Sequence, residues 1–217
     1  MVRVRVYVDG FNLYYGALKT RPACKWLDLA ALSRRLRPGD EIDAVRYFTA
    51  RVKGDRDATS PDRQKLYLAA LSTLPTVSVH FGQFRTHPVM MPRVNPAPRE
   101  PQFAQVYKTE EKGSDVNLAT LLLLDGFDRL YAEALVISDD SDLEGPIKAA
   151  TVRFGPIHVI SPRGPTPTPK GPRAPNVMSH AGATWTPLDV ADLLASQLPS
   201  PLVLPSGRSV YRPPRWT

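Results

Sequence analysis

Three carboxylates follow a short apolar run in the second half of the chain. The run from Ala134 to Ile137 ends at Ser138, and Asp139, Asp140 and Asp142 come within the next four residues. An apolar run of this length is typical of a buried strand. Carboxylates crowded this closely repel one another, and a hard divalent cation relieves the repulsion. The turn after this strand is therefore a candidate metal site, although Asp140 and Asp142 could equally do no more than cap the next helix.

Two other segments each place an aspartate beside a predicted element. Residues 2–8 read as a strand that ends at Asp9, and Asn12 is suited to cap the helix that follows. Asp115 lies in the first turn of a predicted helix, where a carboxylate also stabilises the helix dipole. Sites of open α/β sheets lie at the carboxyl ends of the strands. We therefore expect Asp9, Asp115 and Asp140 to meet in one crevice.

The ligand types in this set indicate which metal it would hold. Carboxylates without histidine or cysteine suit Mg²⁺ or Mn²⁺ rather than zinc. We predict Asp9, Asp115 and Asp140 as the metal ligands. A magnesium ion held by few carboxylates keeps several waters, one of which can be ionised to attack a phosphodiester. The formal net charge of +7 is compatible with a polyanionic partner.

Strands and helices alternate through most of the chain. The predicted strands are 2–8, 42–49, 77–84, 134–138 and 156–161. The predicted helices are 13–19, 29–36, 60–74, 116–124 and 142–151, with a further helical stretch at 127–133. This alternation predicts an α/β fold, a three-layer α/β/α sandwich with a central parallel sheet of about five strands.

Proline marks two zones outside this pattern. Residues 85–105 are proline-rich and form either a hairpin extension or a mobile loop. More than half of the 23 prolines lie after Ser161. We therefore predict a domain at 1–161 and a proline-rich basic extension at 162–217, with a short helix near 187–197. The arginines and aromatic residues of the tail could bind nucleic acid, contact another subunit or be disordered. A homo-oligomer formed through this extension is a further prediction.

Composition narrows the class of protein. A hydrophobic fraction of 42% is enough for a folded core. The single cysteine, Cys24, excludes an intramolecular disulfide and suggests a reducing compartment. No window approaches the roughly 20 apolar residues of a membrane helix, and the first residues enter a strand rather than a signal peptide. We expect a cytoplasmic protein that does not enter a membrane.

Three motifs in this order resemble the NYN domain, a branch of the PIN-like ribonuclease superfamily. They are VYVDGFNLYYGAL, EEKGSDVNLATLLL and VISDDSDLEGPIKAA, and the resemblance covers residues 1–161. It implies the three-layer PIN-like fold and a metal-dependent nuclease, with an endoribonuclease as the expected form. Mg²⁺ or Mn²⁺ would be the cofactor and RNA, or else DNA, the partner.

The resemblance also implies roles for single residues. The implied catalytic carboxylates are Asp9, Asp115, Asp140 and Asp142. The implied substrate-binding residues are Asn12, Ser138 and Lys112. The sequence departs from the family at Asp139, where Gly or Asn is common, and at Leu143, where Phe is frequent. Neither change removes a carboxylate.

The prediction from sequence is thus a metal-dependent ribonuclease that hydrolyses phosphodiester bonds of RNA. The alternative is a non-catalytic module that binds RNA or protein through the same fold. A phosphatase of the haloacid dehalogenase type is disfavoured, because residue 11 is Phe where that chemistry needs a second Asp. The sequence contains no GxxxxGK[ST] or GxGxxG motif, which argues against NTP hydrolysis and dinucleotide binding.

Overall fold

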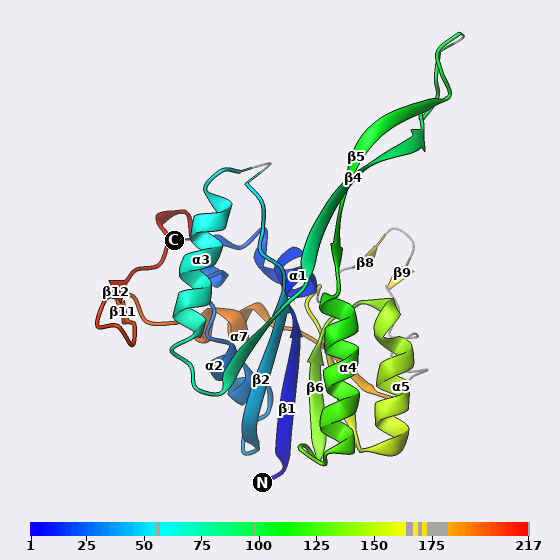
Figure 1. The fold of residues 1–217 in the computed structure, drawn as a ribbon. Helices are drawn as coiled ribbons and strands as arrows, with labels where there is room; N and C mark the ends of the chain where they lie inside the picture. The colour runs from blue at the N-terminus through cyan, green and yellow to red at the C-terminus, as the bar shows by residue number, and fades with distance from the viewer. Residues whose placement is uncertain (55–56, 98, 164–166, 169–170, 173–181, 217) are drawn as a thin grey trace.

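A parallel sheet lies at the centre of the molecule (Figure 1). The computed structural model describes residues 1–54, 57–97, 99–163, 167–168, 171–172 and 182–216. In this part of the chain six strands form the sheet in the order β10-β7-β6-β1-β2-β3, all of them parallel. Their bounds are β1 Arg3–Asp9, β2 Glu41–Thr49, β3 Val77–Phe81, β6 Glu133–Ile137, β7 Ile157–Ser161 and β10 Thr184–Pro187.

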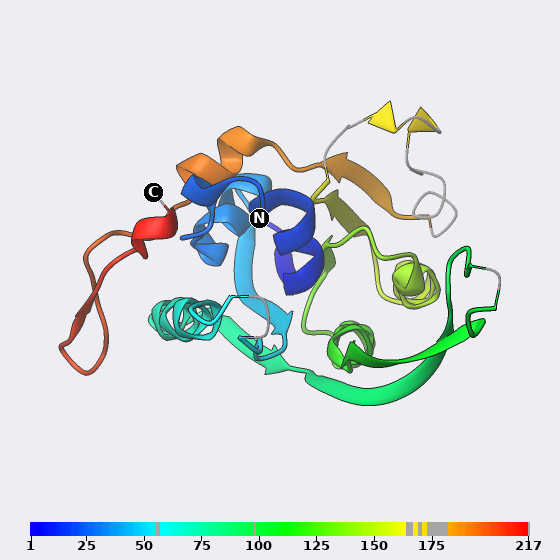
Figure 2. The same ribbon diagram turned by 90° about the horizontal axis from the view of Figure 1, so that it is seen from above.

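Helices cover both faces of the sheet (Figure 2). One face packs against α2 Leu29–Leu36, α3 Ser60–Leu71 and α7 Val190–Ala195, and the other against α4 Ser114–Phe127 and α5 Glu144–Arg153. Shorter turns are α1 Gly10–Leu13, the π-helix η1 Tyr14–Leu18, and the 3-10 helices η2 Pro22–Cys24, η3 Ser141–Leu143 and η4 Pro214–Trp216. This arrangement confirms the predicted α/β fold and is consistent with three layers. Within the described residues, no helix combines the length and the apolar character needed to cross a membrane.

The side chains of β1 alternate between two cores. Val4, Val6 and Val8 are fully buried on the side of α2, α3 and α7. Tyr7 points to the other side, where it packs in one cluster with Leu118 of α4. A parallel strand covered on both faces is apolar almost throughout, which explains why such strands read as continuous runs.

The sheet has one strand more than predicted, and it extends beyond residue 161, where the predicted domain ends. β10 pairs in parallel with β7, from Thr184 opposite His158 to Pro187 opposite Ser161. The strand is short and adjoins proline, so its sequence carries little strand pattern. The helix predicted near 187–197 is present as α7. Residues 173–181 of the proline-rich segment lie outside the described residues.

The described part of the tail packs on its own chain. The Trp216 ring lies 6.2 Å from that of Trp26 and 6.1 Å from that of Tyr67, measured between centroids. Arg215 forms an ion pair with Asp57 at 3.3 Å. Trp26 is fully buried, so the tail covers part of the α2–α3 core. Of the alternatives for the tail, disorder is therefore wrong for Trp216 and Arg215.

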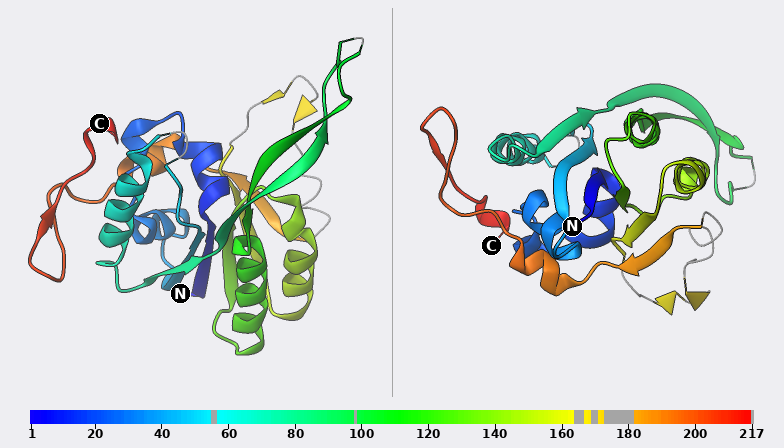
Figure 3. Two further views of the ribbon diagram at one scale, coloured as in Figure 1. Left: turned by 45° about the horizontal axis from the view of Figure 1, so that its top comes forward. Right: turned by 90° about the horizontal axis from the view of Figure 1, so that it is seen from below.

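Two predicted boundaries are corrected by the backbone. The helix predicted at 127–133 does not form, because α4 ends at Phe127 and Arg129 has a positive φ of 55°, which no helix continues. The strand predicted at 77–84 ends at Phe81. After Gly82 the chain enters β4 Gln83–Pro92, which pairs antiparallel with β5 Phe103–Lys112. This hairpin arm projects from the body (Figure 3), so the hairpin alternative for residues 85–105 is confirmed.

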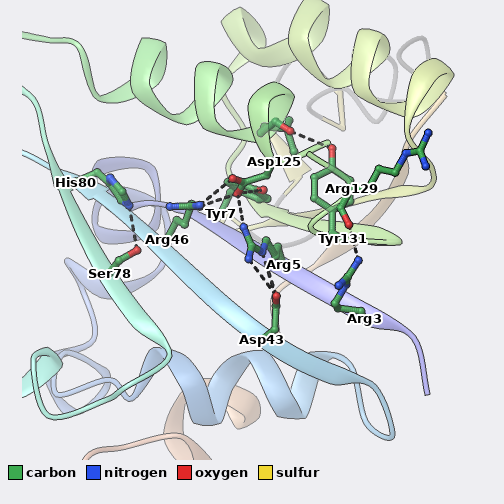
Figure 4. Close-up of polar contacts among 11 residues, drawn as sticks. Arg3, Arg5, Tyr7, Asp43, Arg46, Ser78, His80, Asp125, Arg129 and Tyr131 are labelled. Carbon is green, nitrogen blue, oxygen red and sulfur yellow. Dashed lines mark hydrogen bonds and ion pairs between the residues drawn. The ribbon is translucent and has the colours of Figure 1, made fainter. Parts of the chain in front are cut away.

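A buried ion cluster fastens α4 to the sheet (Figure 4). Asp125 of α4 is 3% exposed and accepts two hydrogen bonds from Arg46 of β2, at 2.7 and 2.8 Å. Tyr7 donates to it at 2.7 Å, and Arg5 forms an ion pair with it at 3.2 Å. Burial raises the pKa of Asp125, but the bonds from Arg46 and Tyr7 outweigh burial and the net pKa is lowered.

Candidate functional site

The candidate site lies where the strand order reverses. After β1 the chain adds β2 and β3 on one side of it, and later adds β6, β7 and β10 on the other. In open α/β sheets such a reversal opens a crevice at the carboxyl ends of the two central strands. Asp9 is the last residue of β1, and Asp140 follows the end of β6 by three residues. The topology therefore brings these two carboxylates to one edge, as predicted.

Hydrogen bonds hold Asp9 in a fixed orientation. The residue is 3% exposed and caps α1, where one carboxylate oxygen accepts the backbone N–H of Asn12 at 2.9 Å. The other oxygen accepts the hydroxyl of Ser138, also at 2.9 Å. Burial raises the pKa of Asp9; the bonds from Asn12 and Ser138 oppose this rise, and the nearby charge of Asp140 adds to it.

The loop after β6 is tied to its neighbours on both sides. Ser138 Oγ accepts the backbone N–H of Asp140 at 3.1 Å, which orients that residue toward Asp9. Asn12 Oδ1 accepts the backbone N–H of Asp139 at 3.0 Å. The Asp139 carboxylate accepts the Ser161 hydroxyl at 2.8 Å, at the end of β7. Asp139, the departure from the family pattern, thus links the ends of β6 and β7.

Asp115 enters the site from the start of α4. Gly113 precedes the helix with a φ of +101°, a conformation that favours glycine, and it turns the chain out of β5. Glu111 caps the helix, because its carboxylate accepts both the backbone N–H and the hydroxyl of Ser114, at 3.2 and 2.6 Å. Ser114, the first residue of α4, is therefore the donor in both bonds of this cap.

The three predicted metal ligands come together. Asp9, Asp115 and Asp140 each offer a carboxylate oxygen, and these three atoms lie within 4.8 Å of one another. Burial first of all, and then the nearby charges of Asp9, Asp140, Glu111 and Asp142 in that order, together raise the pKa of Asp115 to about 6. Mutual repulsion of this kind is what a bound cation would relieve. An all-oxygen donor set fits Mg²⁺ or Mn²⁺, which stays a prediction.

A cavity of about 350 Å³ opens over this trio. Its acidic wall consists of Asp9, Glu111, Asp115 and Asp140. Its aromatic wall consists of Phe11, Tyr15 and Phe84, and Asn12 and Ser114 complete the lining. Phe11 and Phe84 meet edge to face, with ring centroids 5.6 Å apart. The cavity is of the size that holds a small organic molecule and combines a flat apolar side with a charged one.

The remaining predicted site residues lie around the cavity rather than in it. Ser138 is fully buried beneath Asp9 and acts on the site only through its hydrogen bonds. Asp142 is exposed, and its backbone N–H donates to Asp140. The Lys112 side chain is 59% exposed and its Nζ lies 3.5 Å from Glu110. Of the substrate-binding predictions, Asn12 alone lines the cavity.

Five residues that line the cavity were not among the predicted site residues. Four of them lie within the three motifs, so their proximity was a usable signal: Phe11, Tyr15, Glu111 and Ser114. Tyr15 belongs to the π-helix η1, a local distortion often found at functional sites. Phe84 had no such signal, because it reaches the cavity only through the register of the hairpin arm.

The carboxylate trio predicts a pH-dependent response to metal. We expect Mn²⁺ in large excess to raise the melting temperature at pH 7 by roughly 5–10 °C, given about 2.7 kcal/mol at 100 times Kd and 2–4 °C per kcal/mol. The pKa of Asp115 is about 6 in the folded protein, above its ordinary value, so at pH 5 the proton competes with the metal. Differential scanning fluorimetry with and without Mn²⁺ at both pH values measures the effect.

The sign of this effect separates it from general salt stabilisation. Without metal, a raised folded-state pKa means that Asp115 contributes most to stability below its unfolded pKa, and the contribution is lost as pH rises through about 6. Because the proton competes with the metal at pH 5, the rise in melting temperature with Mn²⁺ must be larger at pH 7 than at pH 5. Asp115→Asn should abolish most of the gain at pH 7. An equal gain at both pH values, or in the variant, would contradict a metal site here.

Comparison with known proteins gives one relative over almost the whole chain. The 6-hydroxy-3-succinoylpyridine 3-monooxygenase HspA of Pseudomonas putida (strain DSM 28022 / S16) is 30% identical over 246 aligned positions, which cover 99% of this chain and 75% of the relative. No protein-family model matches the chain. The crystal structure of a protein of unknown function from Vibrio parahaemolyticus RIMD 2210633 covers 87% of this chain and 94% of its own, with 13% identity and a TM-score of 0.49.

This relationship corrects the function predicted from sequence. The relative is a monooxygenase, an oxidoreductase, so the prediction of a ribonuclease that hydrolyses RNA is wrong. The relative is an enzyme, which also argues against a non-catalytic binding module. The prediction failed because a carboxylate trio at a sheet reversal is compatible with a bound cation but does not specify the reaction. The NYN resemblance and an RNA or DNA partner stay predictions.

Proposed function

Because the chain belongs to the family of the 6-hydroxy-3-succinoylpyridine 3-monooxygenase HspA, we propose that it is a monooxygenase that hydroxylates a small hydroxypyridine in the cavity beside Asp9, Asp115 and Asp140. The observation that carries the proposal is the 30% identity to HspA over 99% of the chain. The cavity supports it independently, because its volume and its aromatic wall suit a single planar ring.

The class of reaction determines which co-reactants the enzyme needs. A monooxygenase inserts one oxygen atom of O₂ into a C–H or C–C position of the substrate and reduces the other atom to water. The balance therefore needs two electrons and two protons besides O₂. We propose a reduced nicotinamide, with or without a flavin, as the electron donor. The sequence contains no GxGxxG motif, so the donor would act from solution or from a partner rather than from a Rossmann-type site.

The aromatic wall would orient the ring. Phe11 and Phe84 present an edge-to-face pair at 5.6 Å, and a planar substrate can stack on one ring while it meets the edge of the other. Tyr15 closes the same wall and is 60% exposed. The same cavity is lined by acidic residues, and we propose that the polar edge of a hydroxypyridine turns toward Asp115 and Asp140.

Asp115 is suited to move a proton at the substrate hydroxyl. Its pKa of about 6 lies close to neutral pH, where a carboxylate can both accept and return a proton. Asp9 is held by Asn12 and Ser138 and would keep its place during this transfer. A divalent cation held by Asp9, Asp115 and Asp140 would compete with the proton on Asp115; Asp115 would then serve as a ligand, and the cation would supply the positive charge that stabilises a deprotonated hydroxyl oxygen. Hydroxylation of such a ring is easier once that oxygen carries negative charge.

The direct test is turnover with labelled oxygen. The purified full chain is given 6-hydroxy-3-succinoylpyridine or 2-hydroxypyridine, NADH, Mn²⁺ and ¹⁸O₂, with FAD, with FMN and without flavin. We expect a hydroxylated product that carries one ¹⁸O atom, with consumption of O₂ and NADH in equal amounts. If none of the arms yields labelled product while Mn²⁺ still raises the melting temperature, the metal site stands and the monooxygenase proposal fails.

Phe84→Ala tests the aromatic wall. We expect KM for the hydroxypyridine to rise by about tenfold, because loss of a ring contact worth roughly 1.4 kcal/mol changes affinity by that factor. The turnover number should change much less, because the Phe84 ring has no polar group that could hold a metal or move a proton. Phe127→Ala is the matched control, because Phe127 is 63% exposed at the end of α4 and outside the cavity. Equal KM values for the two variants would remove Phe84 from the substrate contact.

The finer structural assignments are proposals too. We propose that the three layers are those of a PIN-like NYN sandwich, supported by the motifs that carry Asp9, Asp115 and Asp140. We keep the prediction of a cytoplasmic enzyme, supported by the single, buried Cys24.

A further inference from the structure

The hairpin arm leaves one of its two edges unprotected. β4 and β5 form a sheet of two strands, and in the described part of the chain neither pairs with any other strand. A two-stranded ribbon is marginally stable by itself, and its free edges are templates for further pairing. Here the ladder is nevertheless regular over ten residue pairs.

Proline shows which backbone groups point outward. Pairs in an antiparallel ladder alternate between hydrogen-bonded and non-hydrogen-bonded. Pro88 has no N–H, so its pair with Tyr107 belongs to the second kind, and so does the pair of Met90 with Gln105 two positions on. The backbone N–H of Arg93 donates to Gln102 at 2.8 Å, as this alternation requires. The N–H groups of Gln105 and Tyr107 therefore point away from β4.

The two outer edges differ. Pro88 and Pro92 remove two outward donors from β4, a common protection against edge pairing. β5 contains no proline from Phe103 to Lys112, so its outer edge keeps every donor. Its charged residues all lie in the second half of the strand, which leaves 103–107 without the charges that usually guard an edge.

The side chains around this stretch are exposed and apolar. On β5, Tyr107 is 82% exposed and Phe103 52% on one face of the ribbon, and Val106 is exposed on the other face. At the areas typical of such side chains, these three expose on the order of 300 Å². Paired backbone would add to this area, towards the roughly 800 Å² that each partner contributes to a standard stable interface.

We propose that two copies of this chain pair through the outer edges of β5, antiparallel about a two-fold axis, into a four-stranded sheet β4–β5–β5′–β4′. An antiparallel strand edge is complementary to itself about such an axis, which is the geometry of a C2 dimer. The two arms then run in opposite directions, and their apolar stretches lie beside one another around the axis.

Charge favours a second copy over other partners. A two-fold axis at Val106 places Lys108 opposite Ala104, and an axis at Tyr107 places it opposite Val106. No like charges then face one another across the pair, which would destabilise it. A nucleic acid would need lysine or arginine along the edge, and residues 103–107 have none.

Two proline variants in the same residue pair test the proposal. Gln105→Pro removes an outward N–H from β5 and leaves the hairpin ladder intact. Met90→Pro removes the equivalent outward N–H from β4 and is the matched control. Light scattering after size exclusion should give the wild type and Met90→Pro twice the 24.0 kDa of one chain, and Gln105→Pro the single mass. A monomeric wild type at high micromolar concentration, or a dimeric Gln105→Pro, overturns the proposal.

Cross-linking gives a second readout that needs no loss of assembly. Residues at the two-fold axis face their own copies, so Val106→Cys or Tyr107→Cys should form a covalent dimer under mild oxidation. Lys112→Cys lies at the root of the arm, far from the axis, and should not. The natural Cys24 is buried and does not interfere. Equal cross-linking at residue 112, or none at residues 106 and 107, contradicts the β5 edge as the interface.

Discussion

Asp115→Asn is expected to lower the turnover number of the proposed monooxygenase by at least about 100-fold, the usual effect of losing a positioned acid–base group. The amide has the shape of the carboxylate but cannot accept the proton and is a poor ligand for a hard cation. Asp115 lies within 4.8 Å of Asp9 and Asp140 through its carboxylate oxygen, so the change acts at the centre of the site. Steady-state O₂ consumption with a hydroxypyridine measures it.

Stability shows whether that loss is functional. The raised pKa of Asp115 means that its charge is unfavourable in the folded protein at neutral pH. Asp115→Asn should therefore melt at the same or a higher temperature than the metal-free wild type, although it is inactive. Asp62→Asn is the control, because Asp62 also lies in the first turn of its helix, α3, and is exposed. A lower melting temperature together with the activity loss would assign Asp115 a structural role.

The loss of turnover number on replacing the other acidic residues should be larger the closer the residue lies to the trio. Asp140→Asn is expected to approach the loss seen for Asp115→Asn, since Asp140 belongs to the trio. Asp142→Asn should lose less turnover. The Asp142 carboxylate is exposed, and among the described contacts it acts on Asp115 only through its charge. Equal losses of turnover for the two variants would show that Asp142 takes part in the site as directly as Asp140.

Asp125→Asn is expected to lower the free energy of unfolding by about 3 kcal/mol, the lower end of the cost of breaking a buried ion pair. The change leaves Arg46 and Arg5 without the carboxylate that they share, and both guanidinium groups are mostly buried. For a chain of this length about 3 kcal/mol corresponds to a fall in melting temperature of roughly 6–12 °C. Urea unfolding followed by circular dichroism measures it.

Asp43→Asn is the matched control for this cluster. Asp43 bonds to Arg5 alone in Figure 4 and its side chain is 23% exposed, so its loss should cost at most about 1 kcal/mol. The lowered pKa of Asp125 adds a second check. Its contribution is present above the unfolded pKa and lost as pH falls through the folded one, so the variant should lose less stability in acid than the wild type. Equal costs for Asp125→Asn and Asp43→Asn would contradict the buried cluster.

The sequence by itself determined five of the six strands of the described sheet and the position of the carboxylates. β1 and β6 are apolar runs because both of their faces are covered, and such runs can be read without a structure. An aspartate directly after a parallel strand must lie at the carboxyl edge of the sheet. That is why Asp9 and Asp140 could be placed together, with Asp115 added from the start of a helix.

Only the tertiary structure decided the features that depend on distant pairing. β10 is recognisable as a strand because it pairs with β7, more than 20 residues earlier, and its own sequence is too short to show it. Phe84 reaches the cavity through the register of the hairpin arm, which no local pattern specifies. The reaction followed from neither motif nor geometry, because one trio of carboxylates can serve hydrolysis or oxidation, and the proposal of a monooxygenase comes from the kinship to HspA.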